Sequence, residues 1–239
     1  MQDNHDARPF PIDRTALLVL ERTGENTLVV WEPPGVCVVA GRASILEHEI
    51  HLDRCSYHGI PVYRRRGGGA SVVLSPGMLV ITLAVKATWG AIPTLNENLA
   101  QAVATAVTEA GGKPVHVAGH GDLVLADRKV LGASLYFARA HHTLLYQASL
   151  LLAPELELVF RYLKHPPSEP SYRKFRCHRE FLTTFKNEGV HLCRHEMQGL
   201  LRRSLGGLFG GHLRGMPAEA IALNAVSWAN RVQPASSVT

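Results

Sequence analysis

One segment carries most of the information about the fold: Gly121-Asp122-Leu123-Val124-Leu125-Ala126-Asp127-Arg128-Lys129-Val130-Leu131-Gly132-Ala133-Ser134. Apolar residues flank the polar pair Asp127-Arg128, which predicts a strand, a turn and a returning strand. Lys129 begins the returning strand, and the small residues Gly132 and Ala133 follow it. A lysine in this place can be held rigidly beside a narrow cleft, although a hairpin lysine more often faces solvent.

A second segment, Arg64-Arg65-Arg66-Gly67-Gly68-Gly69-Ala70-Ser71, lies between two predicted strands, one at 61–63 and one at 71–74. Glycines allow positive φ and close approach of the backbone to a ligand, and successive amides can then form a nest for an anion. The arginines add bidentate donors for phosphate or carboxylate. The spacing is not that of a P-loop. A flexible basic hairpin tip is the alternative.

The remaining sequence mixes strands and helices without strict βαβ alternation, which predicts an α+β fold with a mixed β-sheet flanked by helices. We expect a helix over 94–110, where Thr94 and Glu97 form a capping box. The other predicted elements are strands at 27–31, 36–40 and 79–85, helices at 45–57, 154–163 and 196–208, and loose tails at 1–11 and 233–239.

Composition indicates a soluble globular protein. Of 239 residues, 46% are hydrophobic and 19% charged, and no apolar run reaches the roughly 18–20 residues of a membrane span. The polar start lacks the pattern of a secretory signal, and the four cysteines are scattered, so we expect a cytoplasmic protein with free thiols. The net charge of +5 fits an anionic ligand, an acidic partner protein or nucleic acid.

Taken in order, several segments resemble the lipoate–protein ligase family, which is related to octanoyltransferases and biotin ligases. The resemblance covers roughly residues 15–185. The matching segments are Trp31-Glu32-Pro33-Pro34, Gly41-Arg42, Gly59-Ile60-Pro61-Val62, the arginines before the glycine loop, Gly121-Asp122-Leu123, Asp127-Arg128-Lys129 and Gly132-Ala133-Ser134.

The resemblance implies a fold like the catalytic core of class II aminoacyl-tRNA synthetases and biotin ligases. It implies a catalytic domain over residues 1–190, with 191–239 as a short helical C-terminal extension packed on it. It also implies that ATP, as its Mg²⁺ complex, activates lipoate or octanoate as an acyl-AMP. A lysine of a lipoyl-carrier protein then accepts the acyl group. The carrier is an H protein, a dehydrogenase E2 domain or a specialised lipoate-binding protein. Known ligases carry a separate C-terminal accessory domain, whereas only a short tail follows residue 178 here, so we expect either this tail or a separate accessory subunit to take its place.

The resemblance also assigns roles to individual residues. Lys129 is the catalytic residue, because its charge can neutralise the carboxylate and the α-phosphate. No protein ligand to a metal is assigned, although Asp122 is a candidate for either metal or nucleotide. The expected ATP-binding residues are Arg65, Ala70, Ser71, Val72, Val73, Asp122 and Lys129, and the expected lipoate-binding residues are Arg64, Gly68, Gly69, Gly132, Ala133, Ser134 and Gln147.

Alternatives of other classes remain open. An octanoyltransferase needs no ATP and uses a cysteine; Cys177 beside His178 is the candidate, although a surface thiol in a basic loop is favoured. A nucleic-acid binding module fits the charge, but aromatics are only 7% and no stacking pair brackets the arginines. The pattern His191-x-Cys193-x-His195 lies in a predicted helix or loop and lacks convincing zinc spacing.

Overall fold

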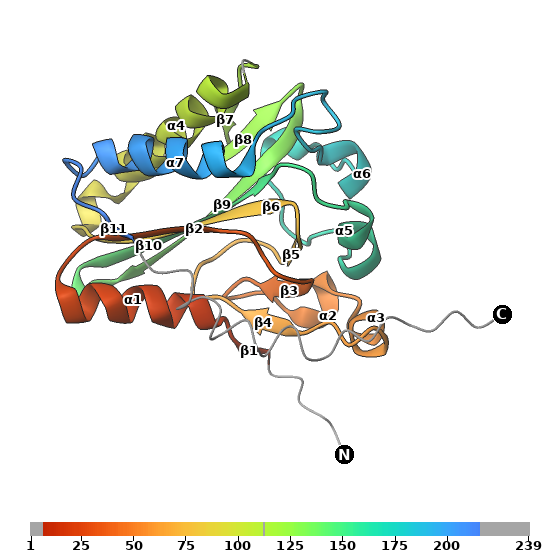
Figure 1. The fold of residues 1–239 in the computed structure, drawn as a ribbon. Coiled ribbons are helices and arrows are strands. Elements are labelled where there is room, and N and C mark those ends of the chain that lie inside the picture. Colours follow the sequence, from red (N-terminus) through yellow and green to blue (C-terminus); the bar gives the residue numbers. More distant parts are fainter. Residues whose placement is uncertain (1–6, 112, 216–239) are drawn as a thin grey trace.

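Two β-sheets packed face to face form the centre of the computed structural model, which describes residues 7–111 and 113–215 (Figure 1). Within these residues the large sheet has seven strands and the small sheet four, and both are mixed. The strands of the large sheet, in spatial order, are β11 (Arg214–Gly215), β2 (Thr27–Trp31), β6 (Met78–Lys86), β10 (Thr143–Leu151), β9 (Arg128–Ala138), β8 (Asp122–Leu125) and β7 (His116–Ala118). Those of the small sheet are β1 (Arg8–Pro9), β4 (Val62–Arg64), β3 (Cys37–Ala40) and β5 (Val72–Leu74).

Helices cover the outer faces of both sheets. The α-helices are α1 (Pro11–Thr23), α2 (Leu46–Glu49), α3 (Leu52–Tyr57), α4 (Ile92–Gly111), α5 (Glu157–Tyr162), α6 (His178–Phe181) and α7 (Arg194–Gly207), and the 3-10 helices are η1 (Trp89–Ala91), η2 (Arg139–His141) and η3 (Ser171–Arg173).

Three hydrophobic clusters join these layers. The first packs α4 and α7 against one face of the large sheet. The second packs α1 and one face of the small sheet against the opposite face of the large sheet. The third fills the far side of the small sheet, beneath α2, α3 and α5. The region between the two sheets is therefore enclosed by strands of both.

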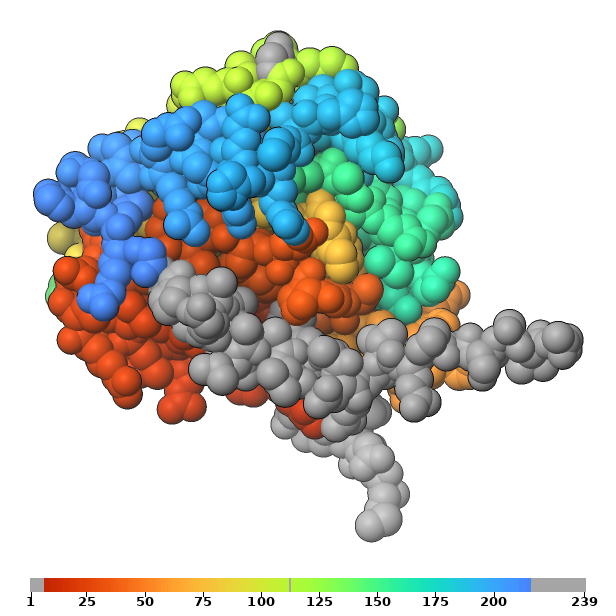
Figure 2. All heavy atoms as spheres, in the orientation of Figure 1, coloured from red at the N-terminus to blue at the C-terminus, as the bar shows by residue number. Residues whose placement is uncertain are grey.

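The C-terminal helix α7 is part of this core. Met197, Leu201 and Leu205 on α7 are fully buried in the first cluster, and the Gln198 side chain donates to the Val30 carbonyl of β2. In the space-filling view, the blue atoms of α7 lie directly against the red atoms of the N-terminal third (Figure 2). The expected boundary at residue 190 stays a prediction, and residues 216–239 lie outside the described residues.

The predicted α+β class and the mixed sheet flanked by helices are confirmed, with two sheets where one was expected. The helix expected over 45–57 is broken after Glu49, because Ile50 forms a β-bridge with Leu163. The expected capping box at Thr94 is wrong, since α4 already begins at Ile92. The loose N-terminal tail is wrong for residues 8–11, which pair with β4 and start α1; residues 1–6 and 233–239 are outside the described residues.

Candidate functional site

A cavity of about 510 Å³ opens between the two sheets and is closed at one side by the segment 163–182. Its lining has an apolar part and a polar part. The apolar part lies where β3, β5, β6 and β10 face one another, and the polar part lies beside β9. The apolar lining includes Phe10, Val39, Val72, Leu74, Met78, Val80, Ala148 and Leu151. The polar lining includes Asp122, Lys129, Ser134, Gln147, Lys164, Arg173 and His178.

A β-bulge orients the lysine. Leu123 pairs with Leu131 but Val124 pairs with Lys129, so β9 carries one extra residue, Val130, opposite β8. Val130 and Leu131 both enter the core beneath α4, whereas Lys129 faces the cavity on the same side as Asp122. Strict alternation along β9 would place Lys129 on the same face as Leu131, so the bulge re-aims the side chain, as bulges beside active sites do.

The turn before Lys129 matches the sequence prediction within one residue. Its central residues are Ala126 and Asp127, with φ of 48° and 62°. Two successive positive φ angles belong to the hairpin turns whose twist matches that of the strands. The hairpin therefore places Lys129 at the second position of β9, close to Asp122 on the partner strand.

Lys129 forms an ion pair inside the cavity. Its Nζ lies 2.9 Å from Asp122 Oδ2, and their side chains are 23% and 12% exposed. The hydroxyl of Tyr172 donates to the same carboxylate oxygen at 2.7 Å. Asp122 was expected to bind metal or nucleotide, and that role stays a prediction; in the structure its carboxylate contacts Lys129 and Tyr172. Among the described residues no group of three or more His, Cys, Asp or Glu side chains could hold a metal ion.

Arg65 lies beneath the glycine loop and shapes it. Its guanidinium is nearly buried and donates to Ser134 Oγ at 3.1 Å and to the carbonyls of Val39, Gly68 and Ala70 at 3.1, 2.6 and 3.0 Å. A guanidinium has five N–H donors, so most of the Arg65 donors are already bound to other groups of the protein. The nucleotide-binding role expected for Arg65 stays a prediction; these contacts show that its guanidinium supports the loop.

Two carboxylates from outside the recognised motifs complete this support. Asp13 Oδ2 accepts from the Arg66 amide at 2.5 Å, and Glu49 Oε2 accepts from the Ser71 amide at 2.6 Å. Burial lowers the pKa of Arg65 to about 10, while the charges of Asp13 and Glu49 act in the opposite direction. Burial also raises the pKa of Asp13. Two of the amides that the sequence offered to an anion are therefore bound by buried carboxylates, an arrangement that no local motif indicates.

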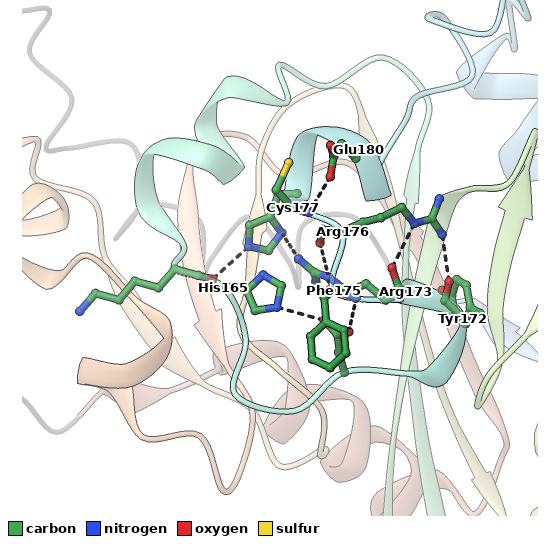
Figure 3. A network of polar contacts seen from close by, with 10 residues as sticks. His165, Tyr172, Arg173, Phe175, Arg176, Cys177 and Glu180 are labelled. Atoms are coloured by element: carbon green, nitrogen blue, oxygen red, sulfur yellow. Dashed lines mark hydrogen bonds and ion pairs between the residues drawn. The ribbon is translucent and has the colours of Figure 1, made fainter.

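The segment 163–182 supplies further polar side chains of the cavity, among them Arg173, which Figure 3 shows within a network of polar contacts. His178 Nε2 lies 3.0 Å from the Lys164 carbonyl and its Nδ1 lies 3.4 Å from an Arg173 nitrogen. This pair of contacts suits the neutral ring with its proton on Nε2. Burial, followed by the charge of Arg173, lowers the pKa of His178 against the effect of the Lys164 hydrogen bond. Sequence reasoning had noted His178 only as a neighbour of Cys177.

Most residues expected at the site do line this one cavity, but two do not. Arg64 is not a lining residue and donates to the carbonyls of Gly41 and Ser44, both at 2.9 Å, and the Gly68 carbonyl accepts from Arg65. The lipoate-binding roles expected for Arg64 and Gly68 stay predictions, although neither residue lines the cavity. The expected residues that line the cavity are Arg65, Gly69, Ala70, Ser71, Val72, Val73, Asp122, Lys129, Gly132, Ala133, Ser134 and Gln147.

The cysteines lie away from the cavity. All four are free thiols; Cys37 and Cys55 are buried in the core, and Cys177 and Cys193 are exposed. Cys177 precedes α6 and is not one of the lining residues, although His178 beside it is. Cys193 precedes α7, so His191, Cys193 and His195 do not form a strand with ligands on one face.

The chain is similar to known proteins in sequence family and in fold. The family model of the lipoyl protein ligase A/B catalytic domain matches residues 9–196. A lipoate protein ligase from Thermoplasma acidophilum with bound lipoic acid superposes with a TM-score of 0.70 at 15% identity, covering 94% of each chain. A lipoate-protein ligase A bound with ATP gives 0.71 at 16% identity, covering 89% of this chain and 87% of the other.

A third structure describes a bipartite lipoate protein ligase and its E2 lipoyl domain from the same archaeon, with a TM-score of 0.69 at 18% identity, covering 91% of this chain and 88% of that one. A search of curated proteins returned no match. At these identities the structural likeness shows the fold, and the family assignment rests on the matching model.

Proposed function

Because the chain belongs to the family of lipoyl protein ligase A/B catalytic domains, we propose that it is an ATP-dependent lipoate–protein ligase. In the proposed reaction it activates lipoate or octanoate as an acyl-AMP and transfers the acyl group to a lysine of a lipoyl-carrier protein. The observation that carries the proposal is one cavity in which Lys129 stands where an apolar lining meets a polar one.

The two parts of the cavity suit the two halves of an acyl-adenylate. An aliphatic acyl chain gains free energy by leaving water, at about 25 cal/mol for each Å² of apolar surface buried. The lining from Val72, Leu74, Met78, Val80 and Leu151 offers that environment. The polar lining beside Lys129 and the segment 163–182 is the proposed place for the phosphate and the nucleoside.

The first proposed step forms the mixed anhydride. A carboxylate oxygen of the acid attacks the α-phosphorus of ATP, the bond from this phosphorus to the oxygen that bridges to the β-phosphate breaks, and pyrophosphate leaves. The acid carboxylate and the ATP phosphate are both negative and repel each other as they approach. The fixed positive charge of Lys129 supports this step because it stabilises that negative charge. Lys164 lines the same cavity and adds positive charge, as does Arg173, which is paired with Glu169. Mg²⁺ would arrive with the ATP phosphates, as it does where proteins bind it through few carboxylates.

The second proposed step transfers the acyl group. The amine of a carrier lysine attacks the carbonyl carbon, the bond to AMP breaks, and the nitrogen loses a proton. The structure of the archaeal ligase with its E2 lipoyl domain supports a lipoyl domain as the partner, and an accessory subunit remains part of the proposal.

We also propose that the protein works in the cytoplasm, and its unpaired thiols support this. Within residues 7–111 and 113–215, none of the helices combines the length and apolar character needed to span a bilayer.

Mass spectrometry of a lipoyl-carrier domain tests the proposal. After incubation with the protein, lipoate, ATP and Mg²⁺, we expect the carrier mass to rise by one lipoyl group, and we expect AMP and pyrophosphate to appear. Modification that needs no ATP and uses an acyl thioester of acyl carrier protein would replace the proposal by an octanoyltransferase. Thermal stabilisation by an oligonucleotide alone, lost at moderate salt, would favour the nucleic-acid alternative.

A further inference from the structure

Tyr172 contacts the carboxylate that holds Lys129. The tyrosine lies in η3 (Ser171–Arg173), and its hydroxyl donates to Asp122 Oδ2 at 2.7 Å. The same oxygen lies 2.9 Å from Lys129 Nζ. One carboxylate oxygen thus receives a neutral donor from the segment 163–182 and a charged donor from β9. Burial, and then the charge of Asp122, raise the pKa of Tyr172, so the phenol keeps its proton and acts as a donor.

The tyrosine is also tied to the hairpin that carries the lysine. Arg176 donates to the Tyr172 carbonyl at 3.0 Å and, through its other terminal nitrogen, to the Asp127 carbonyl at 2.9 Å. Asp127 is in the turn between β8 and β9. Figure 3 shows the Arg176 side chain reaching the Tyr172 carbonyl within this network of polar contacts. The backbone of Tyr172 is therefore held at the turn, while its hydroxyl is held at the first residue of β8.

Phe181 packs close to both Tyr172 and Lys129. Its ring centre lies 5.3 Å from that of Tyr172 and 6.0 Å from Lys129 Nζ. The next residue, Leu182, forms a parallel bridge with Lys129, and the Thr183 amide donates to the Lys129 carbonyl at 3.1 Å. Both the main chain and the ammonium of Lys129 are therefore positioned by the segment that presents the tyrosine.

We infer that Tyr172 is a positioning residue for Lys129 and that it acts through Asp122. The inference rests on the proposed function in taking Lys129 as the catalytic group. A carboxylate with one donor can rotate and carry the ammonium with it. A second donor on the same oxygen fixes the carboxylate, and the ammonium then points at one place in the cavity. Catalysis by a preorganised charge depends on this, because a misplaced cation must be reoriented during the reaction.

The test is a double-mutant cycle on acyl-adenylate formation. Tyr172→Phe removes only the hydroxyl and keeps the ring on Phe181. We expect it to lower kcat about 10-fold, the effect of losing a hydrogen bond to a charged group, with little change in KM for ATP or lipoate. The matched control is Tyr57→Phe, at an 86% exposed tyrosine that does not line the cavity, and its kcat should equal that of the unmodified protein.

The cycle separates positioning from a general role in folding. In an Asp122→Ala background the tyrosine has no carboxylate to hold, so Tyr172→Phe should have no further effect on kcat. A 10-fold loss that persists in that background, or no loss in the single variant, overturns the inference while acyl-adenylate formation by the unmodified protein still supports the proposed function.

A protein that forms no acyl-adenylate would instead overturn the proposed function, and the tyrosine is then tested without catalysis. Acetylation of Lys129 by acetic anhydride, followed by peptide mass spectrometry, reports how firmly the amine is held. We expect Tyr172→Phe to change this rate several-fold, and only when Asp122 is present. An unchanged rate overturns the inference.

Discussion

Lys129 lies over Gly132, so close that a Cβ atom on Gly132 would come within 2.9 Å of both the Cε and the Nζ of the lysine. The bulged residue Val130 and Leu131 lie between them in the sequence. Lys129 and Gly132 both face the cavity. The lysine side chain therefore occupies the space that a side chain at position 132 would fill.

Gly132→Ala should displace the Lys129 ammonium from Asp122. We expect acyl-adenylate formation to fall about 10- to 100-fold, since small displacements of a catalytic group cost rates of that order. The melting temperature should change little, because a flexible side chain can move aside. Gly90→Ala is the matched control, since a Cβ there has no neighbour within 4 Å. Equal activity of the two variants would show that a side chain at position 132 does not displace the Lys129 ammonium.

Lys129→Ala should abolish acyl-adenylate formation while the fold survives. The expected loss is on the order of 10³-fold, as for removal of a preorganised group that stabilises developing charge. Circular dichroism should show an unchanged fold, and Lys86→Ala, at an exposed lysine on the end of β6, should retain full activity. Modification of a carrier domain by Lys129→Ala at the normal rate would remove Lys129 from the mechanism.

Arg65→Ala should destabilise the protein by about 3–5 kcal/mol, because each buried hydrogen bond lost to a charged group costs roughly 1.5–3 kcal/mol. The substitution removes four hydrogen bonds and leaves Asp13 and Glu49 buried without their common cation. The neighbouring Arg66→Ala is the control, because the Arg66 side chain is exposed and should change the free energy of unfolding by less than about 1 kcal/mol. Urea unfolding of both variants measures the difference.

The stability of the protein should depend on His178 below about pH 6.5. Its pKa is lowered in the folded protein, so as the pH falls through 6.5 the unfolded chain takes up the proton first and stability is lost. The free energy of unfolding should therefore fall more steeply between pH 7.5 and 5.5 than in His178→Gln. A midpoint for His178 at or above 6.5, measured by NMR titration of its ring, would contradict this expectation.

Cys177→Ser should be tolerated in the ATP-dependent reaction. The thiol is exposed and does not line the cavity. Carrier modification by the serine variant should proceed at the normal rate, measured by mass spectrometry with lipoate and ATP. Complete loss of acyl transfer from acyl carrier protein in this variant would instead promote the octanoyltransferase mechanism, in which a thiolate takes the acyl group.

The sequence by itself determined the α+β class, the strand–turn–strand unit around Lys129 and the order of segments that identifies the family. These properties follow from local patterns: alternation of apolar residues, turn residues and glycine spacing are legible within a few residues of one another. Most residues assigned to the site from those patterns line a single cavity.

Only the tertiary structure decided which groups hold Lys129 and the glycine loop. Asp13 meets the Arg66 amide across 53 residues, Glu49 meets the Ser71 amide across 22, and Tyr172 meets Asp122 across 50. Such partners leave no periodic signal in the sequence, because their contact depends on how the sheets and the segment 163–182 pack. The bulge at Val130 likewise depends on pairing with β8, and it alone turns Lys129 from the core toward the cavity.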